Sequence, residues 1–205
     1  MINKPKIKNT IETTFSEAIN NNTYSNLDIT ATEENITLNN ITLDTCILNN
    51  IDFTNYNMDN VDIIDSILTN CDLSNINFSN KYLKRIEFNN CKLLGTIFDN
   101  TNFSDVTLNN CILKYASFNK SLLKNINFVN CNLEETSFME TNIKDICFDN
   151  CNLRKSNFYK TSLNNIDLST SNIEGIRIDI KDLNGTTINI EEAVLIANML
   201  GINVK

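Results

Sequence analysis

Residues 91–130 read CKLLGTIFDN TNFSDVTLNN CILKYASFNK SLLKNINFVN, and every fifth residue within them is Leu or Phe. The same register extends in both directions, from Leu38 to Ile188, as an unbroken row of 31 Leu, Phe, Ile or Met residues. Two residues before each of these centres stands a second set of mostly small or apolar residues, such as Cys91 and Thr96. The other three places are mostly polar, so the whole region repeats one pentad.

This five-residue period indicates short strands that turn corners. It fits neither an α-helix, which repeats every ~3.6 residues, nor a long strand, which repeats every ~2. Within each pentad one polar place separates the two apolar places, as strand alternation requires, and the other polar places can form a bend. The last place suits that bend, because Asn tolerates a left-handed backbone. Asn occupies it at Asn40, Asn50, Asn60, Asn70, Asn75, Asn80, Asn90, Asn100 and Asn110.

A slower period of 20 residues sets the size of one coil. Two of its columns are Cys71, Cys91, Cys111, Cys131 and Cys151, and Phe78, Phe98, Phe118, Phe138 and Phe158. Identical residues at a fixed spacing predict vertical ladders, so four pentads form one four-sided coil. The row of centres then gives nearly eight coils, which stack at ~4.8 Å into a rod of roughly 37 Å.

These periods predict an all-β fold, a quadrilateral parallel β-helix of about eight coils over residues 36–189. Residues 1–35 do not follow the register, and a cap over the N-terminal end of the rod is the simplest role for them. Residues 190–205 form a separate C-terminal helix and tail.

The C-terminal residues carry the signals of a short helix. Asn189 suits an N-cap, Glu192 follows three residues later, and Gly201 suits a helix stop. The predicted helix, about 190–200, is apolar on nearly every side, so one side can cover the open end of the rod. We expect another side to pair with the same helix of a second copy in a twofold homodimer, with a cap in a monomer as the alternative. The predicted dimer contacts are Ile190, Ala193, Val194, Ile196, Ala197, Met199, Leu200 and Ile202.

The composition argues against several classes of function. The chain has no His, which removes the imidazole base of many enzymes, so we predict a protein that is not an enzyme and needs no cofactor. The formal net charge of −8 argues against direct binding of nucleic acid. The longest apolar run, 193–197, is too short to cross a membrane, and no secretory signal is visible near the N-terminus. We therefore expect a cytoplasmic protein without membrane contact.

The seven cysteines are expected to be thiols in a reducing compartment. A straight column of thiols lacks the tetrahedral arrangement of a zinc site, so we predict no metal and assign the column to the core. Cys147 falls on an outward place and is expected to be exposed. Lys81 and Lys181 fall on inward places, where a buried ammonium is costly, so we expect local distortion or snorkelling there.

The pentad repeat resembles that of the pentapeptide repeat proteins, whose fold is a right-handed quadrilateral β-helix. Residues 179–204, DIKDLNGTTINIEEAVLIANMLGINV, are similar to the ending of the quinolone-resistance (Qnr-type) members, where a D-L-x-G pentad leads into a dimerising helix that finishes in L-G-I-x-V. The resemblance implies that the chain imitates duplex DNA, binds the type II topoisomerases DNA gyrase and topoisomerase IV, and protects them from quinolones. The unbroken register leaves no room for the projecting loops of many such members.

The charges place any DNA-like surface on the N-terminal coils. Residues 36–80 contain six Asp and no Lys or Arg, whereas residues 81–188 contain 12 acidic and 13 basic residues. A basic DNA channel would be attracted to the first segment. The predicted topoisomerase-binding residues are Asp44, Asp52, Asp59, Asp62, Asp65 and Asp72. Two alternatives remain open: a merely solvated face, or a non-catalytic scaffold for another protein such as a toxin immunity factor or an adaptor.

Overall fold

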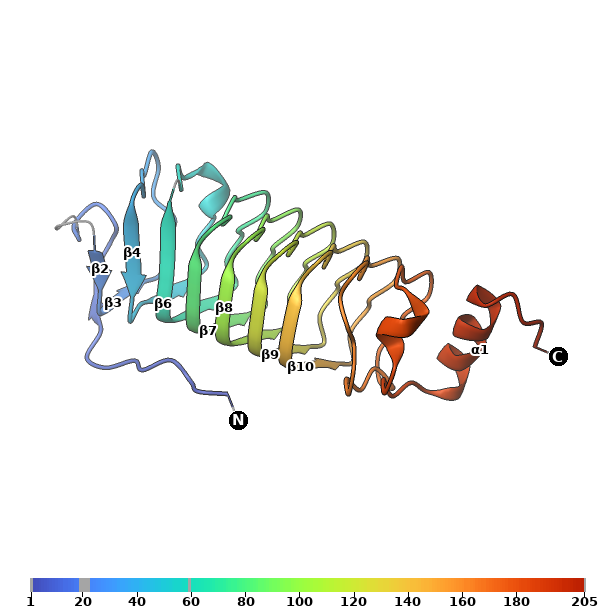
Figure 1. The fold of residues 1–205 in the computed structure, drawn as a ribbon. Coiled ribbons are helices and arrows are strands. Elements are labelled where there is room, and N and C mark those ends of the chain that lie inside the picture. Colours follow the sequence, from blue (N-terminus) through green and yellow to red (C-terminus); the bar gives the residue numbers. More distant parts are fainter. Residues whose placement is uncertain (1, 19–22, 59, 205) are drawn as a thin grey trace.

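The fold is a parallel β-solenoid of about seven turns, seen here in a computed structural model that describes residues 2–18, 23–58 and 60–204. Figure 1 shows its strands side by side along a rod, with one helix at the C-terminal end. The predicted fold class is therefore confirmed, with about seven turns where the repeat period predicts about eight coils. The strands are β1 Ile11–Glu12, β2 Thr23–Ser25, β3 Leu27–Ile29, β4 Ile41–Asp44, β5 Ile47–Asn49, β6 Val61–Thr69, β7 Tyr82–Asn89, β8 Asn102–Asn109, β9 Leu122–Val129 and β10 Asn142–Asp149. The helices are η1 Phe53–Asn55, η2 Ile180–Leu183 and α1 Ile190–Met199.

The strands pair in parallel with a constant offset of 20 residues. Leu83 of β7 lies opposite Phe103 of β8, and Phe103 lies opposite Leu123 of β9. Four pentads therefore make one coil, as the sequence predicts.

Each long strand crosses one corner of the square coil. β7 passes its corner at Arg85 and β8 passes the same corner at Asp105, both with positive φ angles (52° and 59°). The other two sides of the coil pair through isolated bridges, such as Lys92 with Ile112. Asn is the commonest residue at the corners, and its predicted left-handed conformation is confirmed at positions such as Asn90.

The core consists of vertical columns of identical side chains. The Phe118 ring stacks between Phe98 and Phe138, with centroid distances of 4.9 and 5.0 Å. The cysteine column is buried beside these rings, and each thiol lies near a backbone carbonyl, as Cys91 Sγ does at 3.4 Å from Leu68 O. These columns confirm the inward assignment of both residue types.

Aromatic residues close the N-terminal end of the rod. Phe15 is fully buried and makes edge-to-face contacts with Tyr24, Phe53 and Tyr56. The Glu33 carboxylate accepts a hydrogen bond from the backbone N–H of Phe15, which fixes the position of this residue at the end of the rod. Strands β1–β3 add to the sheet before residue 36, and the division of the chain at residue 35 stays a prediction.

The two inward lysines behave differently. Lys81 is half-buried and its ammonium bonds the Asn60 side chain at the surface, so it snorkels as expected. Lys181 is exposed and lies within η2, where the regular pentad geometry is replaced by a 3-10 turn. The coils therefore lose their regular form before Ile188, because an ammonium does not enter the core.

The C-terminal helix begins and ends close to the prediction. α1 spans Ile190–Met199, and the Asn189 side chain caps it by accepting the Glu192 N–H at 2.9 Å. Ile196 packs against the core at the end of the rod, so one side of the helix covers the last coil.

The backbone ladder is interrupted after β10. Residues 142–149 bond β9, but no backbone hydrogen bond joins them to residues 162–169, although the structure describes both segments in full. The following coil pairs forward instead, since Leu163 N and Leu168 N donate to Asp182 O and Thr187 O, each at 2.8 Å. The next two sides of the coil stay closed, as the Asn152–Asn172 bridge shows. The rod therefore opens on one flank only.

Candidate partner-binding surface

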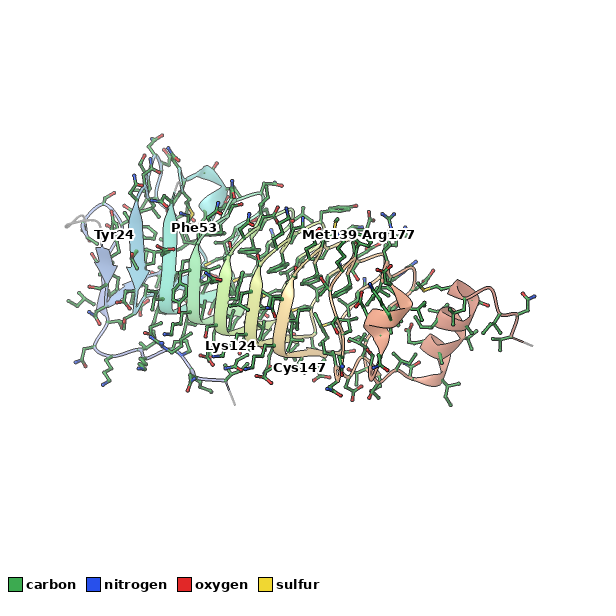
Figure 2. The ribbon with its side chains drawn as sticks, in the orientation of Figure 1. Tyr24, Phe53, Lys124, Met139, Cys147 and Arg177 are labelled. Carbon is green, nitrogen blue, oxygen red and sulfur yellow. The ribbon has the colours of Figure 1, made fainter. Side chains whose placement is uncertain are left out.

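Outward side chains cover the flanks of the rod (Figure 2) and repeat along it in columns. Because the coil is four-sided, residues 40 apart lie two coils apart in one column, and residues ten apart lie on opposite sides. Any partner that contacts one flank therefore meets columns rather than a continuous stretch of sequence.

Two of the predicted acidic residues lie on the side formed by β4 and β6. Asp44 is half-buried and accepts the Thr45 hydroxyl at 2.9 Å. Asp62 is half-buried and accepts the backbone N–H of Tyr82 at 2.9 Å. Neither forms an ion pair among the described residues, so no cation in that part of the chain occupies either carboxylate.

Asp52 and Asp72 lie on the opposite side of the same coils, where they face each other across a parallel bridge. Asp52 caps η1 by accepting the Thr54 N–H. Asp72 forms an ion pair with Lys92 at 3.3 Å. Burial raises the pKa of Asp72, but hydrogen bonds from Ser74 and the Lys92 charge lower that pKa more, so it lies below its usual range. The structure therefore divides the predicted acidic residues between two sides of the rod.

Asp65 is not part of an exposed acidic surface, and that prediction is wrong. It lies at a corner of the coil, is 6% exposed, and forms a buried ion pair with Arg85. The backbone N–H of Lys6 also donates to it at 3.0 Å. Burial raises the pKa of Asp65, but the Arg85 and Lys6 hydrogen bonds outweigh burial and lower it overall. Asp59 lies outside the described residues.

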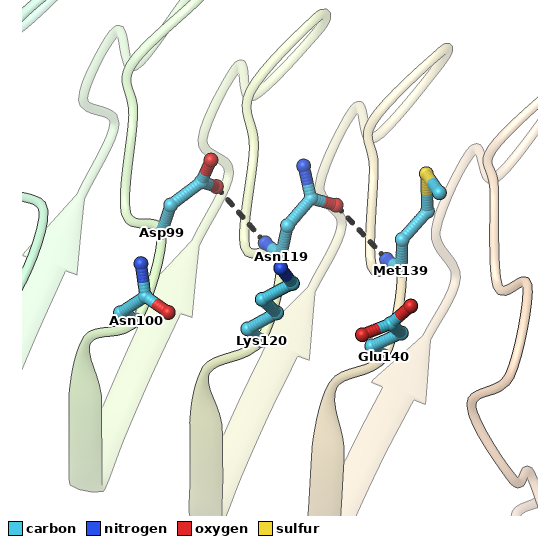
Figure 3. A pocket seen from close by; sticks show the side chains of 6 residues that line it. All are labelled: Asp99, Asn100, Asn119, Lys120, Met139 and Glu140. Atoms are coloured by element: carbon cyan, nitrogen blue, oxygen red, sulfur yellow. Dashed lines mark hydrogen bonds between the residues drawn. The ribbon is translucent and has the colours of Figure 1, made fainter.

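A shallow polar hollow of about 320 Å³ lies over another corner (Figure 3). Its floor is a hydrogen-bond ladder in which Asp99 accepts the Asn119 N–H and Asn119 accepts the Met139 N–H, each at 3.0 Å. Lys120 and Glu140 form its rim. The Asp99 carboxylate is committed to this ladder, so the hollow is a structural feature of the flank.

α1 exposes most of the residues predicted to form a dimer. Ile190 is 86% exposed, Met199, Leu200 and Ile202 are about half exposed, and Ala193 is exposed. Val194, Ile196 and Ala197 are only half-buried, and Ile196 faces the rod. The helix therefore uses part of its apolar surface to cover the last coil and leaves the remainder uncovered, while the role of this surface in dimerisation stays a prediction.

The thiols differ in exposure as the sequence predicts. Cys147 is exposed and the other six are buried. Burial and the nearby carboxylates Asp149 and Asp167 raise the pKa of Cys147, and burial raises that of Cys46 to about 12. Thiols with raised pKa values are poor nucleophiles at neutral pH. Among the described residues, no group of three or more acidic or Cys side chains is placed to hold a metal ion.

A protein-family model and several solved structures are similar to this chain. The family model described as "Pentapeptide repeat region" matches residues 41–118 and 101–178. A search of the curated proteins finds no match. In the described part of the chain, no helix reaches the length and hydrophobicity that a bilayer crossing demands.

Two solved structures illustrate the likeness. A trypsin-treated variant of QnrB1, a plasmid-mediated fluoroquinolone resistance protein, is 22% identical and superimposes with a TM-score of 0.60, over 90% of this chain and 94% of that one. HetL, a pentapeptide repeat protein involved in heterocyst differentiation regulation from the cyanobacterium Nostoc, is 14% identical, with a TM-score of 0.49, over 90% of this chain and 89% of its own. At 22% identity the likeness to the QnrB1 variant shows the fold alone.

Proposed function

Since this chain belongs to the pentapeptide repeat family, we propose that it is a non-catalytic rod that binds bacterial type II topoisomerases, DNA gyrase and topoisomerase IV, and protects them from quinolones. The observation that carries the proposal is the charge distribution. Among the described residues Asp44 and Asp62 have no cationic partner, and they lie on one side of coils that contain no Lys or Arg between residues 36 and 80. Similarity to the QnrB1 fold supports the choice of partner.

The proposed mechanism is electrostatic imitation of DNA. Asp44 and Asp62 present negative charge on one side of the rod, and the basic DNA channel of a topoisomerase attracts such a surface over long distances. Binding then weakens as salt screens the charges. The protein acts in the cytoplasm, where its target lies.

The exposed apolar residues of α1 support a twofold homodimer in this proposal. A second α1 would cover Leu200 and Ile202, which otherwise remain half exposed at the tip of the rod. Two rods joined end to end would offer an acidic coil at each outer end to the enzyme.

Supercoiling by purified gyrase, titrated with this protein with and without a quinolone at two salt concentrations, tests the proposal. We expect recovery of supercoiling in the presence of drug, with a smaller effect at high salt. The variant D44N/D62N should lose most of the effect. Its matched control, E174Q/E191Q, removes the same charge from the other end of the rod and should behave like the parent protein.

A scaffold for a different protein, such as a toxin immunity factor or an adaptor, is the second candidate. It is favoured by the uninterrupted coils, because the described strands from β6 to β10 pair in register without an inserted loop. Unchanged supercoiling and drug sensitivity at every protein concentration would reject the topoisomerase proposal and favour this one.

A further inference from the structure

One side of the rod is formed by β4 and the first halves of β6–β10, which lie side by side in Figure 1. It carries two straight columns of outward side chains, whose successive members are 20 residues apart. The Asp44 column consists of Asp44, Ile64, Lys84, Ser104, Lys124 and Lys144. The Asp62 column consists of Asp62, Tyr82, Asn102, Leu122 and Asn142. Beyond Lys144 this side ends at a cleft of about 320 Å³, lined in part by Ile143 and Ile146, where the backbone ladder is interrupted.

The two columns separate their charges along the rod. Asp44 and Asp62 lie at the N-terminal end, and Lys124 and Lys144 lie toward the other end. None of the four forms an ion pair among the described residues. Asp44 and Lys144 are 100 residues apart, which is five coils, or ~24 Å along the rod. At that distance the two ends cannot neutralise each other within one chain.

The opposite side of the rod arranges its charges differently. There Lys92 pairs with Asp72 at 3.3 Å, and Lys114 pairs with Glu134 at 3.0 Å. Each pair joins neighbouring coils, so these charges are neutralised within the chain. The side with the Asp44 column instead keeps a negative end and a positive end.

Apolar side chains occupy the middle of the same side. Tyr82 is 42% exposed, Leu122 is 38% exposed, and Ile64 is half-buried. Residues 2–10 leave these side chains exposed, because their hydrogen bonds to the rod go to the corner beside the two columns. An apolar middle with charges around it is the usual composition of a protein interface.

We propose that this side binds the same side of a second copy, with the two rods antiparallel. The copies are related by a twofold axis that runs along the strands and passes between β7 and β8. Each β4 then lies opposite the other copy's β10, and each β6 lies opposite the other copy's β9. Asp44 meets Lys144 of the second copy, and Asp62 lies within reach of its Lys124. The axis repeats both contacts, so four ion pairs surround the apolar middle.

The charges select this register over its neighbours. In the proposed register Lys84 meets Ser104 of the second copy, and its ammonium stays 5.9 Å from the centre of its own Tyr82 ring. An axis on β7 would place Lys84 against Lys84 of the second copy. An axis on β8 would place it against Lys124. Both shifts oppose like charges, which is unfavourable.

The size of the two columns indicates a weak contact. They span about 24 Å along the rod and about four residues, or ~13 Å, across it, which is roughly 300 Å² of flat area per copy. Stable complexes bury about 800 Å² per partner, so we expect a dissociation constant on the order of 100 μM at low salt. Because the contact covers Asp44 and Asp62, a paired rod has neither available for another protein. The inference itself does not rest on the proposed function.

Exchanged charges test the contact in the full chain by sedimentation at low salt. D44K/D62K and K124D/K144D should each weaken self-association at least about tenfold, because like charges then face each other. An equimolar mixture of the two variants should restore it, since all four ion pairs regain opposite charges. Contacts through α1 are the same in every variant, so they cannot produce this restoration. A mixture that associates no better than its components would overturn the proposal.

K84Q is the matched control for the register. It removes one lysine from the Asp44 column that has no acidic partner across the axis, so it should associate at least as tightly as the parent. If K84Q weakened association as K124D/K144D does, the contact would be a general attraction to lysines and the register would be wrong. Absence of parent self-association up to about 1 mM at low salt would also overturn the proposal.

A disulfide supplies the second measurement. In the background C147S, which removes the exposed thiol, D44C/K144C should form covalent dimers on mild oxidation. Its two new thiols are ~24 Å apart within one chain, and a disulfide needs Cα atoms within about 7 Å, so the bond must join two copies. The control D44C/K84C should cross-link at least about tenfold more slowly, and equal rates would overturn the register. None of these outcomes depends on whether the protein binds a topoisomerase.

Discussion

The junction between β9 and β10 and the junction after β10 use the same repeat but pair differently. In the first, the N–H of Asn130 donates to Asp149 O at 2.9 Å, as in every long strand before it. In the second, the N–H of Asn150 donates to the Thr170 hydroxyl at 3.0 Å, and the backbone bonds are missing. The inward residues differ accordingly: Leu123 and Ile126 are fully buried, whereas Ile143 and Ile146 are only half-buried.

This difference shows that a continuous column of apolar side chains does not guarantee a continuous ladder of backbone hydrogen bonds. Leu163 and Ile166 continue the columns of Leu123 and Ile126 with suitable side chains. Their coil pairs with residues 181–188, which η2 has already displaced from regular geometry. Because residues 162–169 bond to this distorted segment, they lie too far from β10 to bond to it as well. A backbone hydrogen bond tolerates little change in distance.

A buried charge should give the largest difference in unfolding free energy between the two junctions. F118D places a carboxylate between stacked rings in the closed region and should cost more than about 5 kcal/mol, so little folded protein remains. I143D, beside the cleft, can reach water and should cost about 1 to 2 kcal/mol. Urea unfolding followed by circular dichroism measures both. A parent-like midpoint for F118D would refute the inward column.

Truncation of matched isoleucines should separate the junctions by a smaller amount. I126A removes a fully buried side chain and should destabilise by about 3 kcal/mol, near the middle of the range for buried Ile. I146A removes a half-buried side chain and should cost about 1 kcal/mol. The same urea titration gives both free energies of unfolding. Equal losses would mean that the cleft is closed in solution.

Backbone exchange should distinguish the junctions without any mutation. The 20-residue register directs the N–H groups of Ile143 and Phe148 toward residues 162–169, where they find no carbonyl. They should exchange at least about tenfold faster than those of Leu123 and Phe128, which corresponds to about 1.4 kcal/mol. Hydrogen exchange read by NMR resolves these amides. Equal protection in the two strands would contradict the open ladder.

The smallest expected effect is that of acid on the free energy of unfolding. It acts through Asp65, which accepts hydrogen bonds from Arg85 and from the backbone N–H of Lys6. The pKa of Asp65 is lowered in the folded protein, so its contribution is present above the ordinary value of 3.8 and is lost as pH falls through the folded value. We expect the parent to lose up to about 1 kcal/mol more than D65N between about pH 5 and pH 2. Unfolding free energies at several pH values provide the test. If the unfolding free energies of the parent and D65N changed with pH in parallel, Asp65 would contribute nothing to the acid sensitivity.

Much of the surface chemistry depends on contacts between distant residues. The six aspartates of residues 36–80 look alike in the sequence, yet Asp65 is buried against Arg85 and the backbone of Lys6, while Asp44 and Asp62 form no ion pair with any described residue. The corner position of Asp65 could have been read from the pentad register. The hydrogen bond that Asp65 accepts from Lys6, 59 residues away, could not have been predicted, because residues 1–35 do not follow that register.

The sequence by itself determined the coil, its 20-residue length, the inward columns and the capped helix α1, because each depends on local periodicity or on neighbours at a constant spacing. Only the tertiary structure decided where the backbone hydrogen-bond ladder is interrupted, which carboxylates residues 2–10 contact, and which side of α1 remains exposed. Those features depend on small displacements that accumulate between coils and on how two chain ends fold back onto the rod. No repeat encodes either of them, since every pentad carries nearly the same pattern.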